Sequence, residues 1–401
     1  MSASSESGGP DLLLKGGHVI DPSNAINGRA DVAINGGRVQ AVSPDLPSDG
    51  RTVLDVTGLY VTPGIIDMHA HVFHTHRRSS LSLEPRVNTF SSGVTTVVDA
   101  GTSGWRDFVE FRSEVIDQAK IRVLAYINIV GSGMLGEWEH DVREMRPKLA
   151  AAMAEEHRDV VVGIKTAHYW AKRPFDADHA PWAAVDAAVE AGELSGLPVM
   201  VDFFPWLPER PYPELILEKM RPGDIHTHVF AQQFPIIDDQ GKVYDHLFEA
   251  RERGVIFDLG HGAASFWFRN AVPAIQQGFV PDSISTDLHT GNVNGPVIDM
   301  LTTMNKVLNM GLTLEDVIAR STVAPAREIG RRDLGTLNPG AEADVAILAM
   351  EEGDFSFVDC GQTRLTGQRR LRCVLTMRAG EIVYNPEGLG LLTWEQQSAV
   401  E

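Results

Sequence analysis

Eight short apolar runs, rich in β-branched residues, recur along this 401-residue chain, and stretches with a helical pattern separate them. WAAVDAAVEAGEL, residues 182–194, is one such helical stretch. Strands that are covered by helices on both faces are expected to be continuously apolar, as these runs are. Eight consecutive units over about 250 residues favour a (β/α)8 TIM barrel of the α/β class over a doubly wound sheet, which usually has fewer strands. The runs are residues 65–72, 94–100, 121–130, 159–167, 197–203, 224–230, 255–262 and 282–288.

Both ends of the chain have a different pattern, in which short Val, Ile and Leu segments alternate with Gly, Asp and Asn. Each pattern predicts a small antiparallel sheet. We therefore expect residues 11–62 and 336–401 to form one small β-sandwich domain beside a catalytic barrel domain of residues 63–335. Residues 1–10, MSASSESGGP, have no apolar stretch and are expected to be a flexible, solvated tail instead of a signal peptide.

The composition predicts a folded cytoplasmic protein, with 43% hydrophobic residues and a formal net charge of -19. Such a charge argues against nucleic acid or an anionic membrane surface as a partner, since phosphate groups need a basic face. No apolar run is long enough to cross a bilayer. The two cysteines, Cys360 and Cys373, support neither a disulfide framework nor a thiolate metal site. A small-molecule substrate is the expected partner, and any metal must be held by histidine, carboxylate or lysine.

Polar residues that can bind metals stand at the ends of several runs, where barrel enzymes carry their catalytic groups. His69 and His71 are two apart on the first run, so both side chains point to one face, which suits two imidazoles on one ion. His74 follows in a loop and is a minor candidate for substrate contact. The other residues at run ends are Lys165, Asp202, His226, His228, His261 and Asp287.

Lys165 and Asp287 each allow two interpretations. An ammonium group buried beside divalent metals is disfavoured, but reaction of Lys165 with CO₂ would give an anionic carbamate that can bridge two ions. Alternatively, Lys165 is an ordinary lysine that extends to solvent or pairs with a carboxylate. Asp287 is either the N-cap of a following segment or a metal ligand that takes a proton from the attacking water.

The segment GLYVTPGIIDMHAHV, residues 58–72, resembles the first-strand motif of amidohydrolase-superfamily enzymes such as dihydroorotase, hydantoinase and D-aminoacylase. DIHTHVF, DLGHGAASF and ISTDLHTGN resemble the sixth, seventh and eighth strands of that superfamily. APAREIGRRDLGTLNPGAEADVAIL resembles the return into the sandwich. The resemblance covers residues 11–385 and is greatest to the branch of dihydroorotase-like deacetylases.

This resemblance implies a site for one or two divalent ions, Zn²⁺ above all. It assigns His69, His71 and Asp287 to the more buried metal, carboxylated Lys165 to a bridge, and His228 to the second metal. His226 falls where the family commonly has an apolar residue. Asp202 stands where the family has a histidine, so the second metal is either bound by Asp202 or absent.

The expected activity is hydrolysis of an amide or ester bond by a metal-activated hydroxide, with Asp287 passing the proton to the leaving group. The substrate would be an N-acyl amino acid or an acyl hydroxy acid. The alternatives are a cyclic amide hydrolase, a deaminase, which the lack of a suitable glutamate disfavours, and a non-catalytic scaffold. The family also suggests a homo-oligomer. Candidate substrate contacts are His261, His289, His168 and Tyr169, and the arginines that either bind a carboxylate or are solvated are Arg77, Arg78, Arg173 and Arg210.

Overall fold

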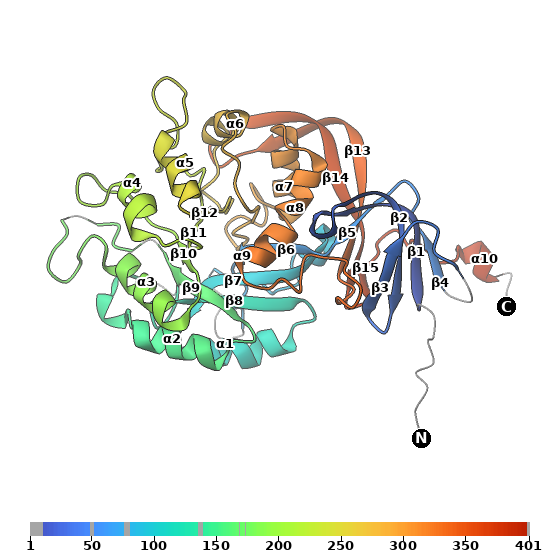
Figure 1. Ribbon diagram of the computed structural model, residues 1–401, viewed down its shortest axis with the longest axis horizontal. Helices are drawn as coiled ribbons and strands as arrows, with labels where there is room; N and C mark the ends of the chain where they lie inside the picture. Colours follow the sequence, from blue (N-terminus) through green and yellow to red (C-terminus); the bar gives the residue numbers. More distant parts are fainter. Residues whose placement is uncertain are drawn as a thin grey trace.

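A computed structural model describes residues 11–48, 52–75, 81–134, 139–167, 169–172 and 174–398. Within these residues, seven parallel strands form one sheet in which neighbours in the sequence are neighbours in space, from β6 to β12 (Figure 1). The sheet confirms the predicted α/β class and seven of the eight predicted runs. Its strands are β6 (Ile65–Ala70), β7 (Val94–Gly104), β8 (Arg122–Asn128), β9 (Val161–Thr166), β10 (Val199–Val201), β11 (Ile225–His226) and β12 (Ile256–Phe257).

Helices connect these strands, and α3 shows why the sequence forms them. Its alanines Ala184, Ala188 and Ala191 are buried and lie on one face of the helix. The helix ends at Gly196, which takes the left-handed conformation with φ 67° that favours glycine at a helix end. The helices of this region are α1 (Phe108–Glu114), α2 (Pro147–Glu156), α3 (Ala183–Ser195), α4 (Tyr212–Glu214, continued by a π-helical turn, Leu215–Lys219), α5 (Asp245–Glu252), α6 (Phe268–Gln276), α7 (Met300–Asn309), α8 (Leu314–Ala319) and α9 (Val323–Glu328).

Residues 282–288, which the sequence predicts as the eighth strand, make isolated bridges in place of a regular strand. Ser283 bridges to Asp258 beside β12, and Leu288 bridges to Ala70 at the end of β6. The segment therefore contacts both edge strands of the sheet. Its regularity is broken at Asp287, whose φ of 51° lies in the left-handed region and is incompatible with an extended strand.

Strands from both ends of the chain form a second, mixed sheet, which lies to the right in Figure 1. β13 pairs antiparallel with β5, for example Ala346 with Thr62, so the two ends share this sheet. The prediction of antiparallel sheets was wrong in one respect, because β1 pairs parallel with both β4 and β5. The strands are β1 (Leu12–Asp21), β2 (Ile26–Asn35), β3 (Arg38–Ser43), β4 (Thr52–Asp55), β5 (Tyr60–Pro63), β13 (Val345–Val358), β14 (Arg364–Arg378) and β15 (Glu381–Tyr384).

The hairpin of β13 and β14 reaches from the mixed sheet to the start of α6 (Figure 1). At its tip, the backbone N–H of Cys360 donates to the carbonyl oxygen of Phe266 over 3.0 Å. The carboxylate of Asp359 accepts from the N–H of Phe268 over 2.9 Å. These bonds attach the hairpin to the segment that follows β12. A short helix, α10 (Trp394–Ser398), ends the described chain.

None of the helices in the described ranges is both long enough and apolar enough to cross a membrane.

Candidate metal centre

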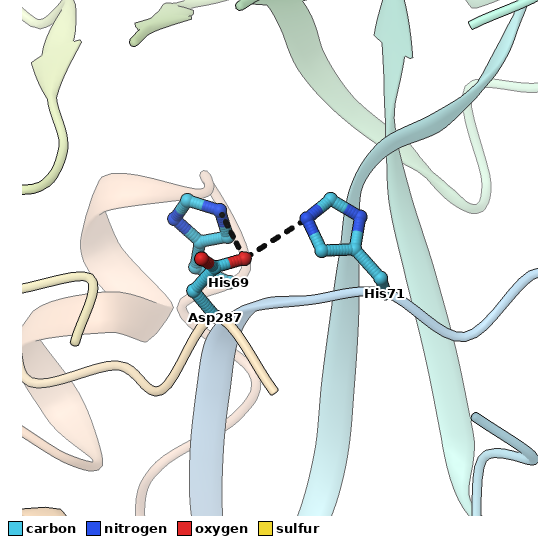
Figure 2. A group of neighbouring side chains, drawn as sticks. All are labelled: His69, His71 and Asp287. Atoms are coloured by element: carbon cyan, nitrogen blue, oxygen red, sulfur yellow. Dashed lines mark ion pairs between the residues drawn. The ribbon is translucent and has the colours of Figure 1, made fainter. Parts of the chain in front are cut away.

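His69, His71 and Asp287 bring potential ligand atoms within 4.8 Å of one another, and all three side chains are buried. One carboxylate oxygen of Asp287 lies 2.9 Å from Nε2 of His71 and 3.4 Å from Nε2 of His69. Figure 2 shows the two imidazoles on either side of this carboxylate. His69 lies near the end of β6, His71 directly follows this strand, and Asp287 comes from the segment that bridges to it. The arrangement is the one expected of three ligands around one divalent ion.

His228 lies beside this cluster, and its imidazole centre is 4.9 Å from that of His69. Its Nδ1 donates to the carbonyl oxygen of Gly260 over 2.5 Å, so Nε2 is the ring nitrogen that faces the cluster. This Nε2 lies 3.4 Å from Asp202 Oδ2 and 4.0 Å from Asp287 Oδ2. Nε2 of His228 therefore lies on the side where two carboxylates converge.

Two residues of the centre have strained backbones. His228 and Asp287 have φ angles of 63° and 51°, a region that costs a residue other than glycine about 1–3 kcal/mol. Neighbouring bonds hold Asp287 in this conformation: its N–H donates to the carbonyl of His69 over 2.6 Å, and Asn292 donates to its carbonyl over 2.7 Å. Asp67 accepts two further bonds from Thr286, the preceding residue. The side chains of both residues lie in the cluster.

Lys165 is the residue before the last of β9 and is fully buried. Its Nζ has no hydrogen-bond partner among the residues that the structure describes. Burial lowers the pKa of Lys165 against the opposing effect of the nearby carboxylates, Asp202 first among them. Space for the lysine stem is provided by Gly101, where a Cβ would lie 2.6 Å from the Cβ of Lys165. The interpretation of Lys165 as a lysine that extends to solvent was therefore wrong, because its whole side chain is buried.

The electrostatics of the centre also fit a bound cation. Asp202, Asp258 and Asp287 are buried together around the histidines and Lys165. Although burial acts to raise the pKa of Asp287, the charges and hydrogen bonds of His69 and His71 hold that pKa well below its usual range. Buried carboxylates need compensating positive charge, which one or two divalent ions would supply.

The predicted substrate contacts differ in how the structure places them. His289 lies next to the cluster, with its ring centre 6.2 Å from that of His71. His261 is fully buried, and both of its ring nitrogens have bonds within the protein, to Gly262 and to Lys306. Tyr169 is buried, whereas His74 is exposed in the loop predicted for it. His168, Arg77, Arg78 and Arg173 lie outside the described residues.

Two other residues are packed away from solvent. His226 lies among Phe203, Tyr212 and Phe234, and its burial there lowers its pKa to about 3. The interpretation of Arg210 as a solvated loop residue was wrong: it is 1% exposed, and it donates to the carbonyl oxygen of Tyr169 over 2.7 Å. Burial lowers the pKa of Arg210 to about 10.

Sequence reasoning missed the polar residues that contact the imidazoles at Nδ1, the ring nitrogen on the side away from Asp287. Thr227 Oγ1 lies 2.8 Å from Nδ1 of His69, and Thr102 Oγ1 lies 2.7 Å from Nδ1 of His71. Asp258 accepts hydrogen bonds beneath His69. A signal was present for Asp258, since a charged residue interrupts the apolar run VIFDLG. The two threonines are unremarkable in sequence.

Comparisons with known proteins agree with this geometry. Residues 60–186 and 295–384 match two profiles described as amidohydrolase family. A deacetylase of Enterococcus faecalis is 31% identical over 94% of this chain and 99% of its own length. A deacetylase of Agrobacterium fabrum is 31% identical over 87% of this chain and 86% of its own. An adenine deaminase structure superposes with a TM-score of 0.85 at 30% identity over 94% of this chain and all of that one. A dihydroorotase structure superposes with a TM-score of 0.80 at 27% identity, and the match covers 93% of this chain and 99% of the dihydroorotase. The chain belongs to the amidohydrolase family of hydrolytic enzymes.

Proposed function

We propose that this protein is a metal-dependent deacetylase, which hydrolyses the amide or ester bond of a small acylated substrate. The observation that carries the proposal is the convergence of His69, His71 and Asp287 beside His228 and the buried Lys165. The deacetylases that share 31% of their residues with this chain support the acyl specificity. N-acyl amino acids and acyl hydroxy acids are the substrates proposed.

In this proposal, His69, His71 and Asp287 hold one divalent ion, for which their nitrogen and oxygen donors suit Zn²⁺. His228 and Asp202 would hold a second ion, and carboxylated Lys165 would supply a further anionic ligand. Residues 282–288 act as the eighth strand and close the sheet into a (β/α)8 barrel. The barrel, residues 63–335, and the terminal sandwich, residues 11–62 and 336–401, are then the two domains.

The mechanism needs one group that polarises the scissile carbonyl and one group that transfers a proton. A bound divalent ion would polarise the scissile carbonyl and increase the acidity of the attacking water. Asp287, at the centre of the cluster, accepts the proton of that water and passes it to the leaving nitrogen or oxygen. His289 lies at the rim of the cluster and is proposed to contact the substrate, as are His261 and His168.

A cyclic amide hydrolase is the second candidate, because a dihydroorotase structure resembles this chain over nearly its whole length. The two candidates differ in the product. Opening a ring yields one molecule, whereas deacylation releases acetate or another free acid. Deamination of adenine, the activity named for another similar structure, would release ammonia.

The test is to measure metal content and then to screen substrates with the metal-loaded enzyme. N-acyl amino acids, acyl hydroxy acids, hydantoins, dihydroorotate and adenine would be compared for release of acid or ammonia. Acid release from the first two classes, lost in Lys165→Ala together with one equivalent of metal, is the expected result. Turnover of adenine or of cyclic amides alone would overturn the deacetylase proposal, and unchanged turnover in Lys165→Ala would remove the carbamate from it.

A further inference from the structure

Three hydroxyl groups converge on the carboxylate of Asp258, which is fully buried just after β12. Ser283 Oγ donates to Oδ1 over 2.9 Å. Thr227 Oγ1 and Ser285 Oγ each donate to Oδ2 over 2.7 Å. An ionised carboxylate can only accept hydrogen bonds, so the single proton of each hydroxyl is directed to Asp258. Each hydroxyl oxygen is then left to accept from another donor.

For Thr227, that donor is His69. Nδ1 of His69 lies 2.8 Å from Thr227 Oγ1 but 3.8 Å from the carboxylate itself, which is too far for a hydrogen bond. Since the Thr227 proton is already given to Asp258, Nδ1 of His69 must carry the proton between them. The other ring nitrogen of His69, Nε2, faces Asp287 at 3.4 Å, and in the neutral tautomer fixed by Thr227 it presents a lone pair there.

For Ser285, the donor is the backbone N–H of Gly260, at 3.1 Å. The carbonyl oxygen of the same residue accepts from Nδ1 of His228 over 2.5 Å. Residue 260 has no room for a side chain, because a Cβ would lie 2.2 Å from Thr227 Oγ1 and 2.9 Å from Nδ1 of His228. Because residue 260 is a glycine, its backbone can lie close to both Thr227 and His228.

We propose that Asp258 is a positioning residue that orients His69 through Thr227 and His228 through Ser285 and Gly260. The inference deepens the proposed function, because it takes these two histidines as metal ligands. Carboxylates and other acceptors behind a metal-binding imidazole select its tautomer and increase its basicity. One buried carboxylate therefore controls ligands that come from two different strands, and its loss affects both proposed metal positions.

The structure offers a matched pair of variants. Thr227→Val and Ser283→Ala each remove one hydroxyl donor to Asp258, but only Thr227 connects to a histidine. Zinc affinity, measured by competition with a chelator in the absence of substrate, should fall about 10- to 100-fold in Thr227→Val. It should stay at the wild-type value in Ser283→Ala and be recovered in Thr227→Ser. Ser285→Ala should weaken the second equivalent of zinc.

Equal zinc affinities in Thr227→Val and Ser283→Ala would overturn the proposal. If Thr227→Val does not fold, Ser285→Ala takes its place, and a second zinc equivalent as tight as in Ser283→Ala is then the contradicting result. His69→Asn separates this inference from the proposed metal site. Wild-type affinity in His69→Asn would refute the metal site itself, whereas a loss there without a loss in Thr227→Val would refute only the role of Asp258.

Discussion

The amine of Lys306 donates a hydrogen bond to Nε2 of His261 over 2.7 Å, and both side chains are fully buried. A second bond joins Lys306 Nζ to the carbonyl oxygen of Pro296 at 2.8 Å. On its other side, Nδ1 of His261 donates to the carbonyl of Gly262 over 3.0 Å. Substrate contact by His261 stays a prediction, and it would require the ring to exchange its bond with Lys306.

Lys306→Met is expected to change how stability depends on pH. Burial lowers the pKa of Lys306 to about 7, from an ordinary value of 10.5. Between these values the unfolded chain binds more protons than the folded one, so stability increases with pH, by at most about 1.4 kcal/mol per pH unit for one group. In urea unfolding, the advantage of the wild type over Lys306→Met should therefore grow from neutral pH upward. Parallel pH curves for the two proteins would contradict this, and the exposed Lys148→Met is the control.

Glu328→Gln is expected to change the pH dependence of stability in the opposite direction. Burial raises the pKa of Glu328 to about 8, from an ordinary 4.5. Between these values the folded protein holds a proton that the unfolded chain has lost, so stability decreases as pH rises, by at most about 1.4 kcal/mol per unit. Glutamine is neutral at every pH. The variant should match the wild type below about pH 4.5, exceed it increasingly in free energy of unfolding as the pH rises from there to about 8, and keep a constant advantage above that pH. The exposed Glu190→Gln should show no such divergence.

Gly101→Ala tests whether the space around Lys165 is needed. Gly101 and Gly278 have similar φ angles, 80° and 85°, so an alanine at either position has a similar left-handed cost of about 1–2 kcal/mol. Only at Gly101 would the new methyl group collide with the Cβ and Cγ of Lys165, at 2.6 and 2.7 Å. Gly101→Ala should therefore lose about 1–3 kcal/mol more than Gly278→Ala and should bind less metal. Equal losses in thermal unfolding and equal metal content would show that Lys165 has room to move.

Most of the parallel sheet was predictable because its strands are buried on both faces and are continuously apolar. The irregularity of segment 282–288 was not predictable, since its sequence does not indicate that Asp287 takes a left-handed conformation. Pairing of β5 with β13 was also beyond the sequence, because such pairing depends on contacts between the two ends of the chain.

The gathering of buried polar side chains was predictable where they stand at the ends of the apolar runs, as for His69, His71 and Lys165; their roles as ligands stay predictions. It was not predictable where a group acts through a distant partner. Lys306 lies 45 residues from His261, and Asp258 lies 31 residues from Thr227, so neither bond has a signature in local spacing. Arg210 was misread for the same reason, because its carbonyl partners come from another connection.

We expect Asp202 to decide whether the centre holds one metal ion or two. It is buried, its Oδ2 lies 3.4 Å from Nε2 of His228, and its N–H donates to the carbonyl of Thr166, the residue after Lys165. Lys165, Asp202 and His228 thus lie at the carboxyl ends of the three neighbouring strands β9, β10 and β11. If Asp202 is a ligand, it contributes a negative charge where the family has a neutral histidine, which makes the second ion a weaker Lewis acid.

Asp202→Ala should therefore lower the zinc content from about two equivalents to about one, whereas Asp202→His should keep two, because imidazole is also a zinc ligand. The histidine variant should in addition lower the pH at which activity rises, since removing a negative charge favours ionisation of the attacking water. Metal analysis and pH–rate profiles of purified protein are the measurements. Asp224→Asn serves as the control, because Asp224 is equally buried but precedes β11 and pairs with Arg221. Two equivalents of zinc in Asp202→Ala would show that Asp202 is not a ligand and that His228 holds the second ion without it.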